Sequence, residues 1–165
     1  MTIEIREART EEHAQAGAVT ADAYREFARE GDPDWQAYLL RLADVADRAA
    51  RTTILVAVEE DRIVGTATLE LDGRTEPDDD PLMPEEAHIR MLGVVPDARG
   101  RGIGRMIMEA CEGRAQASGR TLITLNTTLL MRSAQRMYES LGYSRGEDRV
   151  FPDGFVLLSY SKQLV

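Results

Sequence analysis

The junction between residues 92 and 106, LGVVPDARGRGIGRM, constrains the fold of this chain more than any other segment. An apolar run typical of a strand comes first, and a run typical of a helix follows. Three glycines and three arginines lie between Arg99 and Arg105. A helix start leaves several backbone N–H groups unpaired and carries partial positive charge. Because glycines leave that backbone accessible and arginines can add bidentate contacts, the junction predicts a polyphosphate site.

The rest of the chain limits the partners of such a site. Its 165 residues favour a single domain, 1–165, and its net charge is -9. That charge argues against nucleic acid and against an anionic membrane surface as partners. The sequence shows neither a signal peptide nor an apolar run long enough for a membrane helix, and its one cysteine, Cys111, allows no internal disulfide. We therefore expect a cytoplasmic protein.

Apolar periodicity and turn residues predict the order strand, two helices, three strands, helix, strand, helix, two strands. The first helix is expected to end at about Arg29, and the second to present one apolar face from Trp35 to Ala49. Residues 72–86 hold three prolines and a run of carboxylates, which predicts a loop. This order is typical of an α/β (α+β) fold whose central sheet has helices packed on both faces.

The glycine spacing narrows the type of phosphate site. A P-loop would end in Gly-Lys-Ser/Thr, and a dinucleotide fingerprint would need glycine at Arg105. The pattern present is Arg99-x-x-Gly102-x-Gly104 after the segment 92–94, and AQRMYESLGY follows at 134–143. These two segments resemble motif A and the A-x-x-x-Y-x-x-x-G-F/Y segment of the GNAT superfamily of acyl-CoA-dependent N-acetyltransferases.

The resemblance covers nearly the whole chain and implies the GNAT fold, a mixed, mostly antiparallel sheet of about seven strands with helices on both faces. It also implies acetyl-CoA as the acyl-donor cosubstrate and no metal. The pyrophosphate of coenzyme A would lie on the glycine-arginine loop, and the pantetheine arm would lie in a gap beside the preceding strand. The residues implied are Leu92, Gly93, Val94, Arg99, Gly100, Arg101, Gly102, Ile103 and Gly104. Asn126, taken as the end of the neighbouring strand, is either a further contact or a turn former.

The same resemblance implies roles in proton transfer. In many GNAT enzymes the base is a glutamate four residues before the leucine of the L-x-V segment, and here that position is His88. With a pKa near 6.5, histidine would be largely neutral at pH 7 and would titrate near pH 6–7. Strand alternation places His88, Arg90 and Leu92 on one face, with Glu86 as a reserve base. The family's general acid corresponds to Tyr138. The alternatives are a structural histidine at 88 and a packed aromatic at 138.

Two functions fit these motifs. One is an N-acetyltransferase that moves an acetyl group from acetyl-CoA to a primary amine of a small molecule or peptide, by direct attack in a ternary complex. The other is a non-catalytic module that senses acyl-CoA. Cys111, in the helix after the loop, is expected to be a small core residue, and the family's mechanism needs no acyl-cysteine. The carboxylates of Asp78, Asp79 and Asp80 either attract a cationic amine or only solvate their loop. The acceptor and the oligomeric state, a homodimer included, stay open.

Overall fold

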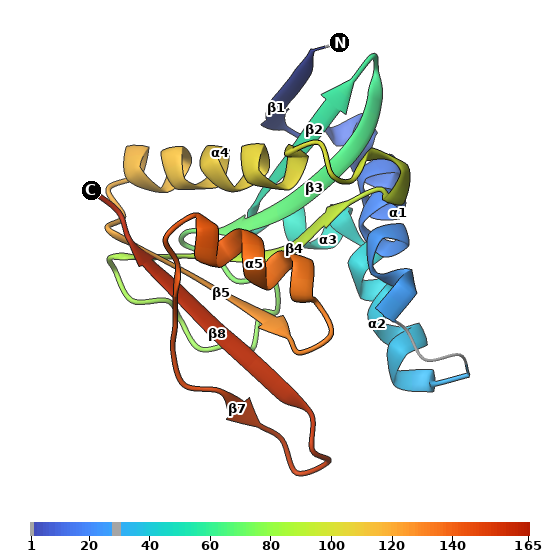
Figure 1. Ribbon diagram of the computed structural model, residues 1–165. Coiled ribbons are helices and arrows are strands. Elements are labelled where there is room, and N and C mark those ends of the chain that lie inside the picture. Colours follow the sequence, from blue (N-terminus) through green and yellow to red (C-terminus); the bar gives the residue numbers. More distant parts are fainter. Residues whose placement is uncertain (1, 28–30) are drawn as a thin grey trace.

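The computed structural model describes residues 2–27 and 31–165 (Figure 1). One eight-stranded sheet has the order β1-β2-β3-β4-β5-β8-β6, and β7 pairs with β8 beside that path. Only β4 and β5 run parallel; the other neighbouring strands of the described sheet run antiparallel. The expected mixed, mostly antiparallel sheet is therefore confirmed. The strands are β1 (Ile3–Glu7), β2 (Thr53–Glu59), β3 (Arg62–Glu70), β4 (Glu86–Val94), β5 (Leu122–Thr128), β6 (Ser144–Arg145), β7 (Arg149–Val150) and β8 (Val156–Gln163).

Helices cover both faces of this sheet, as expected. The described α-helices are α1 (His13–Tyr24), α2 (Pro33–Ala43), α3 (Val45–Ala49), α4 (Ile103–Ala117) and α5 (Arg132–Ser140). Alternation along β2 separates the two layers, because Leu55 and Ala57 lie in one core with α4 and α5. Ile54 and Val56 lie in another core with Ala16 of α1 and residues of α3. In Figure 1, α4 and α5 cross one side of the sheet, while α1, α2 and α3 lie toward the other.

The helix expected from Trp35 to Ala49 is instead two helices that meet at Asp44. The Asp44 backbone leaves the helical conformation (φ -87°, ψ 66°), and its carboxylate accepts a hydrogen bond from the Asp47 N–H at 3.2 Å. The buried Arg48 side chain donates to the carbonyls of Arg41 (2.8 Å) and Leu42 (2.9 Å), which satisfies the end of α2. At the first helix, α1 ends at Tyr24 and a 3₁₀ turn (Arg25–Phe27) follows; the expected end near Arg29 falls outside the described residues.

A β-bulge in β4 overturns the expectation that His88, Arg90 and Leu92 share one face. Arg90 opposes Thr68 and Gly93 opposes Thr66, so β4 contains one residue more than β3 between these pairs. Met91 takes the left-handed conformation (φ 56°) and packs in the core formed with residues of α1 and α2. Leu92 then packs toward α4 and α5, opposite to His88 and Arg90. A bulge reverses strand alternation, and no glycine at this position signals it in the sequence.

The parallel strands β4 and β5 separate soon after they meet. They pair from Glu86 with Leu122 to Ile89 with Leu125, and no described pairing between them goes further. Beyond that point β4 follows β3 to Val94, while β5 follows β8 to Thr128. The facing strand edges therefore carry backbone N–H and C=O groups that an extended ligand can bind.

The contact between α1 and α2 gives a prediction about stability. A Cβ built at Gly17 in α1 would lie 2.0 Å from the Ala43 carbonyl oxygen, whereas one at Gly113 in α4 meets no atom within 4 Å. We predict that Gly17→Ala lowers the free energy of unfolding by about 1–3 kcal/mol, because the helix backbone must move. The control, Gly113→Ala, is expected to raise it by about 0.5–1 kcal/mol. Urea unfolding of both variants measures the difference, and effects of the same sign would contradict the prediction.

Candidate active site

The glycine-arginine loop joins β4 to α4. A 3₁₀ turn (Pro96–Ala98) follows β4, and α4 begins at Ile103 with Gly102 as its N-cap residue. Gly100 and Gly102 have φ angles of +77° and +80°, which side chains rarely adopt, so the turn itself requires glycine there. At Gly104 the reason is close packing, because a Cβ would lie 3.2 Å from the Met137 sulfur of α5.

This loop presents a row of free backbone donors. Within the described chain, the N–H groups of residues 100–105 make no hydrogen bond, and the first helical bond runs from the Met106 N–H to the Gly102 carbonyl at 3.0 Å. These donors lie at the positive end of the α4 dipole. The arrangement suits an anion with several oxygens, as the sequence pattern predicts.

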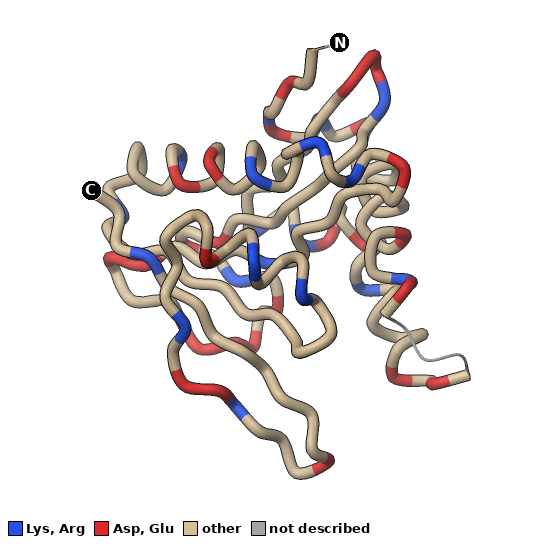
Figure 2. Tube along the Cα trace, in the orientation of Figure 1, with Lys and Arg blue, Asp and Glu red and all other residues tan. Residues whose placement is uncertain are grey.

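The loop's arginine side chains are already engaged within the protein. Arg99 donates to the carbonyls of Val94 and Ala23, both at 3.0 Å, and pairs with Glu26 beyond the end of α1. Arg101 donates to Glu59 of β2 at 3.0 Å, and this contact lowers the pKa of Glu59. In Figure 2 basic and acidic residues are interspersed over the described part of the chain. The arginines thus tie the loop to α1 and β2, while the backbone provides the unpaired donors.

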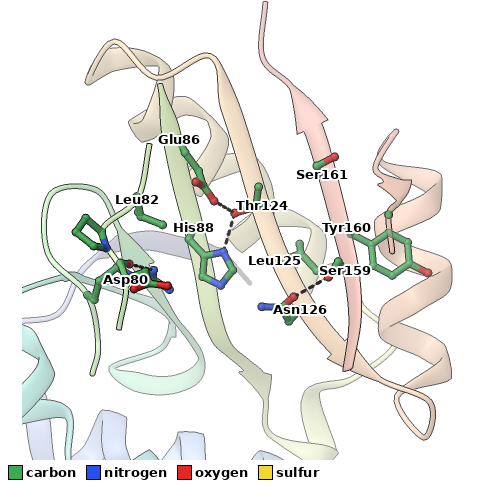
Figure 3. A pocket seen from close by; sticks show the side chains of 13 residues that line it. Asp80, Leu82, Glu86, His88, Thr124, Leu125, Asn126, Ser159, Tyr160 and Ser161 are labelled. Atoms are coloured by element: carbon green, nitrogen blue, oxygen red, sulfur yellow. Dashed lines mark hydrogen bonds between the residues drawn. The ribbon is translucent and has the colours of Figure 1, made fainter. Parts of the chain in front are cut away.

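A pocket of about 330 Å³ lies over β4, β5 and β8 beneath the loop 71–85 (Figure 3). Fully buried Glu70 anchors that loop, since it accepts from the Arg74 side chain at 3.1 Å and from the Thr75 N–H. Apolar and polar side chains both line the pocket, and the polar ones include Arg74, Asp80, Glu86, His88, Thr124 and Asn126.

The carboxylates of this loop differ in their surroundings. Asp79 forms an ion pair with Arg90 of β4 at 2.9 Å and lies 3.8 Å from Arg74, whereas Asp80 lines the pocket. Arg74 also donates to the Asp80 carbonyl at 2.6 Å. The loop is therefore folded onto the sheet and partly neutralised. Of the two sequence interpretations, attraction of an amine now depends mainly on Asp80, beside the pocket.

Two expected base candidates, His88 and Glu86, are brought together through a third residue. His88 Nδ1 lies 2.7 Å from the Thr124 hydroxyl oxygen, and that hydroxyl donates to Glu86 Oε2 at 2.6 Å. Burial, with the nearby cations of Arg74 and Arg90, lowers the pKa of His88 to about 4. His88 is therefore neutral at pH 7 as expected, but its ionisation lies well below the expected pH 6–7.

Tyr138 lies on the opposite face of the sheet from His88. Its ring in α5 packs against Tyr143 and Tyr160, with centroid distances of 6.1 and 5.8 Å. Burial raises the pKa of Tyr138, so its hydroxyl keeps its proton at neutral pH. The pKa of Tyr24 on α1 is raised by burial and by the charges of Tyr38 and Tyr138.

Asn126 lies inside β5, which continues to Thr128, so its interpretation as a strand-end turn former is wrong. Its side-chain oxygen accepts a hydrogen bond from the Ser159 hydroxyl at 3.2 Å (Figure 3). It lies one residue beyond Leu125, where the pairing of β5 with β4 stops. Asn126 therefore borders both the pocket and the opening between the strands.

Sequence reasoning missed Glu70 and Thr124. The available signal for Thr124 was the alternation in β5, where polar Thr124 and Asn126 are separated by apolar Leu125. That alternation shows a polar face, but only the parallel register places Thr124 opposite His88. The sequence gives no comparable signal that a glutamate ending β3 is fully buried.

Cys111 is fully buried, and burial raises the pKa of its thiol to about 12, which confirms the expected core position. In the described ranges, no group of three or more His, Cys, Asp or Glu side chains is arranged to hold a metal ion. No helix within those ranges is long and apolar enough to cross a membrane.

Comparison with known proteins decides the family. The model of the acetyltransferase (GNAT) family matches residues 18–143. The chain belongs to the GNAT family. GNAT acetyltransferases are acyl-CoA-dependent transferases, so this chain is an acetyltransferase that acts with acetyl-CoA.

Solved structures agree with the GNAT fold along the chain. YncA from Salmonella typhimurium, solved with its cofactor acetyl-CoA, is 20% identical with a TM-score of 0.73, over 100% of this chain and 95% of that one. The PaiA N-acetyltransferase of Thermoplasma acidophilum, in complex with coenzyme A, is 13% identical with a TM-score of 0.72, over 96% and 98%. The ribosomal-protein-S18-alanine N-acetyltransferase of Escherichia coli is 16% identical with a TM-score of 0.70, over 99% and 94%. At these identities the similarity shows the fold alone.

The lowered pKa of His88 gives a prediction about pH and stability. The pKa falls from 6.5 to about 4 on folding, so the unfolded chain binds this proton more tightly. The contribution of neutral His88 is complete above pH 6.5 and is lost as the pH falls toward 4. Between pH 7 and pH 5 this group alone should lower the free energy of unfolding by about 2 kcal/mol.

Urea unfolding at both pH values tests this in the wild type and in His88→Gln. The variant keeps a polar, uncharged side chain and removes the titration, so it should lose about 2 kcal/mol less on acidification. His13 is present in both proteins and cancels in the comparison. Equal losses would show that His88 titrates normally in the folded protein.

Proposed function

We propose that this GNAT protein transfers the acetyl group of acetyl-CoA to a primary amine of a small molecule or peptide, by direct attack in a ternary complex. One observation carries the proposal: the separation of β4 from β5 lies between the free backbone donors after Val94 and the pocket at His88. A ligand that binds the loop through phosphates and lies along β4 would bring its far end to that pocket.

The donor would bind along β4 and its loop. The backbone of Arg99, Gly100, Arg101, Gly102, Ile103 and Gly104 would hold the pyrophosphate, while the side chains of Arg99 and Arg101 keep the loop in place. The pantetheine arm would lie against the backbone of Leu92, Gly93 and Val94, with Asn126 across the opening. Support comes from YncA and PaiA, which share this fold and were solved with acetyl-CoA and coenzyme A.

The chemistry requires a base on the acceptor side. An alkyl amine with a pKa of about 10.4 is mostly protonated at neutral pH and cannot then attack a thioester. Neutral His88 would take that proton, directly or through a water molecule. The amine nitrogen then forms a C–N bond to the acetyl carbonyl carbon, and the C–S bond breaks. The low pKa of His88 keeps it unprotonated, although it makes the histidine a weaker base.

The departing thiolate requires a proton donor on the other side. Tyr138 would supply it, because burial raises its pKa and keeps the hydroxyl protonated. The same apolar core around the ring disfavours the tyrosinate that proton donation leaves, which makes Tyr138 a weaker acid. In this proposal base and acid come from opposite faces of the sheet and would act at the opening between β4 and β5. Glu86, the reserve base, is engaged with Thr124 and with the Met83 N–H.

Donor binding can be tested at the N-cap of α4. Gly102→Val forces a side chain onto a φ of +80°, so the row of N–H groups should shift and acetyl-CoA affinity should fall about tenfold or more. Gly119→Val is the matched control, since Gly119 has a φ of +81° at the opposite end of α4. Calorimetric titration with acetyl-CoA measures both variants. Unchanged affinity in a folded Gly102→Val protein would rule out this loop as the donor site.

The acid assignment can be tested by removing one hydroxyl. Tyr138→Phe should lower kcat by about 10²–10⁴ while acetyl-CoA affinity stays nearly constant. Tyr143→Phe is the control, because Tyr143 belongs to the same aromatic group and its hydroxyl donates to Glu112 of α4. The assay measures release of coenzyme A with a panel of amines. A wild-type rate in Tyr138→Phe would overturn the assignment of Tyr138 as the acid. If the wild type binds acetyl-CoA but acetylates no amine, the protein is an acyl-CoA sensor.

A further inference from the structure

Two short hydrogen bonds link the side chains of His88, Thr124 and Glu86 into one polar chain. Its two contacts are short, at 2.7 Å from His88 Nδ1 to Thr124 Oγ1 and at 2.6 Å from Thr124 Oγ1 to Glu86 Oε2. Figure 3 shows Thr124 between the other two side chains, with its oxygen directed at both. His88 and Thr124 are partners in the parallel register, so the backbone of β4 and β5 fixes this contact.

The number of protons on these three side chains determines which group donates in each hydrogen bond. A threonine hydroxyl carries one proton, and a carboxylate can only accept. The proton of Thr124 is therefore directed at Glu86, and its oxygen lone pair accepts from His88. The other acceptor near this hydroxyl, the Ala87 carbonyl, is more distant at 3.4 Å. His88 Nδ1 must then carry the ring proton, which leaves Nε2 with the free lone pair in the neutral imidazole.

The surroundings of Nε2 fit a proton acceptor. His88 lines the pocket, and its Nε2 has no hydrogen-bond partner among the residues that the structure describes. The charged groups around the ring are Arg74 and Arg90, which disfavour a protonated histidine, and Glu86 and Asp79, which favour it. Glu70 is opposite His88 in β3, and Asp80 lies in the pocket wall. Burial of the ring is the larger effect and, with the two arginines, outweighs the carboxylates, so a second proton on the ring is held weakly.

We propose that Thr124 is a positioning residue that fixes the tautomer of His88, so that Nε2 faces the pocket as the proton acceptor. Thr124 itself does not touch the reacting atoms. When Nε2 takes the proton of the amine, the Nδ1–H stays bonded to Thr124, and the Thr124 hydroxyl connects it to the Glu86 carboxylate. No proton needs to move onto Glu86, whose two oxygens already accept from Thr124 and from the Met83 N–H at 3.3 Å. The catalytic part of this inference rests on the proposed function, whereas the tautomer does not.

The tautomer can be measured without any assay of activity. The chain has two histidines, so ¹⁵N NMR of histidine-labelled protein at pH 7 gives two ring systems, and a His13→Gln variant identifies His88. The wild type should show a protonated Nδ1 and an unprotonated Nε2. Thr124→Val removes the hydroxyl and keeps the shape, and should shift the ring toward the other tautomer. Thr124→Ser should restore the wild-type pattern. A wild-type ring with its proton on Nε2 overturns the inference, even if Thr124→Val does not fold.

Kinetics provide the second readout. Thr124→Val should lower kcat by about 10–10³-fold with little change in acetyl-CoA affinity, and Thr124→Ser should recover most of it. Thr121→Val is the control, because Thr121 is exposed just before β5 and its side chain makes no hydrogen bond within the described residues. Wild-type kcat in Thr124→Val would overturn the positioning role. A tautomer shift in a protein that acetylates no amine would support the positioning of His88 and contradict the proposed function.

Discussion

One extra residue in β4 determines which side chains of the strand meet which layer. Before Met91, His88 lines the pocket and Arg90 pairs with Asp79 on the same face; after it, Leu92 and Val94 face the apolar core under α4 and α5. At Gly93 the strand passes close to α1, because a Cβ there would lie 2.6 Å from Ala23, so this position has no room for a side chain. A bulge bends and twists its strand, and β4 leaves β5 in this same region. Both halves of the site therefore depend on one irregular strand.

The two faces of the sheet give their titratable groups different surroundings. On the pocket face, Glu70, Arg74, Arg90 and Asp79 form a connected set of charges that holds the loop 71–85 in place. The other face is apolar and aromatic around Tyr138. Burial lowers the pKa of the histidine on the first face and raises that of the tyrosine on the second. A base free of its proton and an acid that keeps its proton can thus coexist at pH 7.

The features predictable from the sequence depend on neighbours along the chain. The loop conformation follows from Gly100 and Gly102, and the two layers follow from the periodicities of strand and helix. The features that were missed depend on contacts between distant segments. The helix break at Asp44 depends on Arg48, whose side chain donates to the carbonyls that end α2. The polar chain through Thr124 requires the register of β4 with β5. The pKa of His88 likewise reflects burial that no local pattern reveals.

The internal pairing of Arg99 and Arg101 has a consequence for ligand selection. Glu26 and Glu59 act as resident counterions, and being tethered they compete at a high effective concentration. A small monovalent anion from solution displaces such counterions poorly. An anion with several linked oxygens can leave both ion pairs intact and spread over the N–H row of residues 100–105. The side chains of Arg99 and Arg101 thus hold the loop in shape, while its backbone N–H groups stay available to an anion.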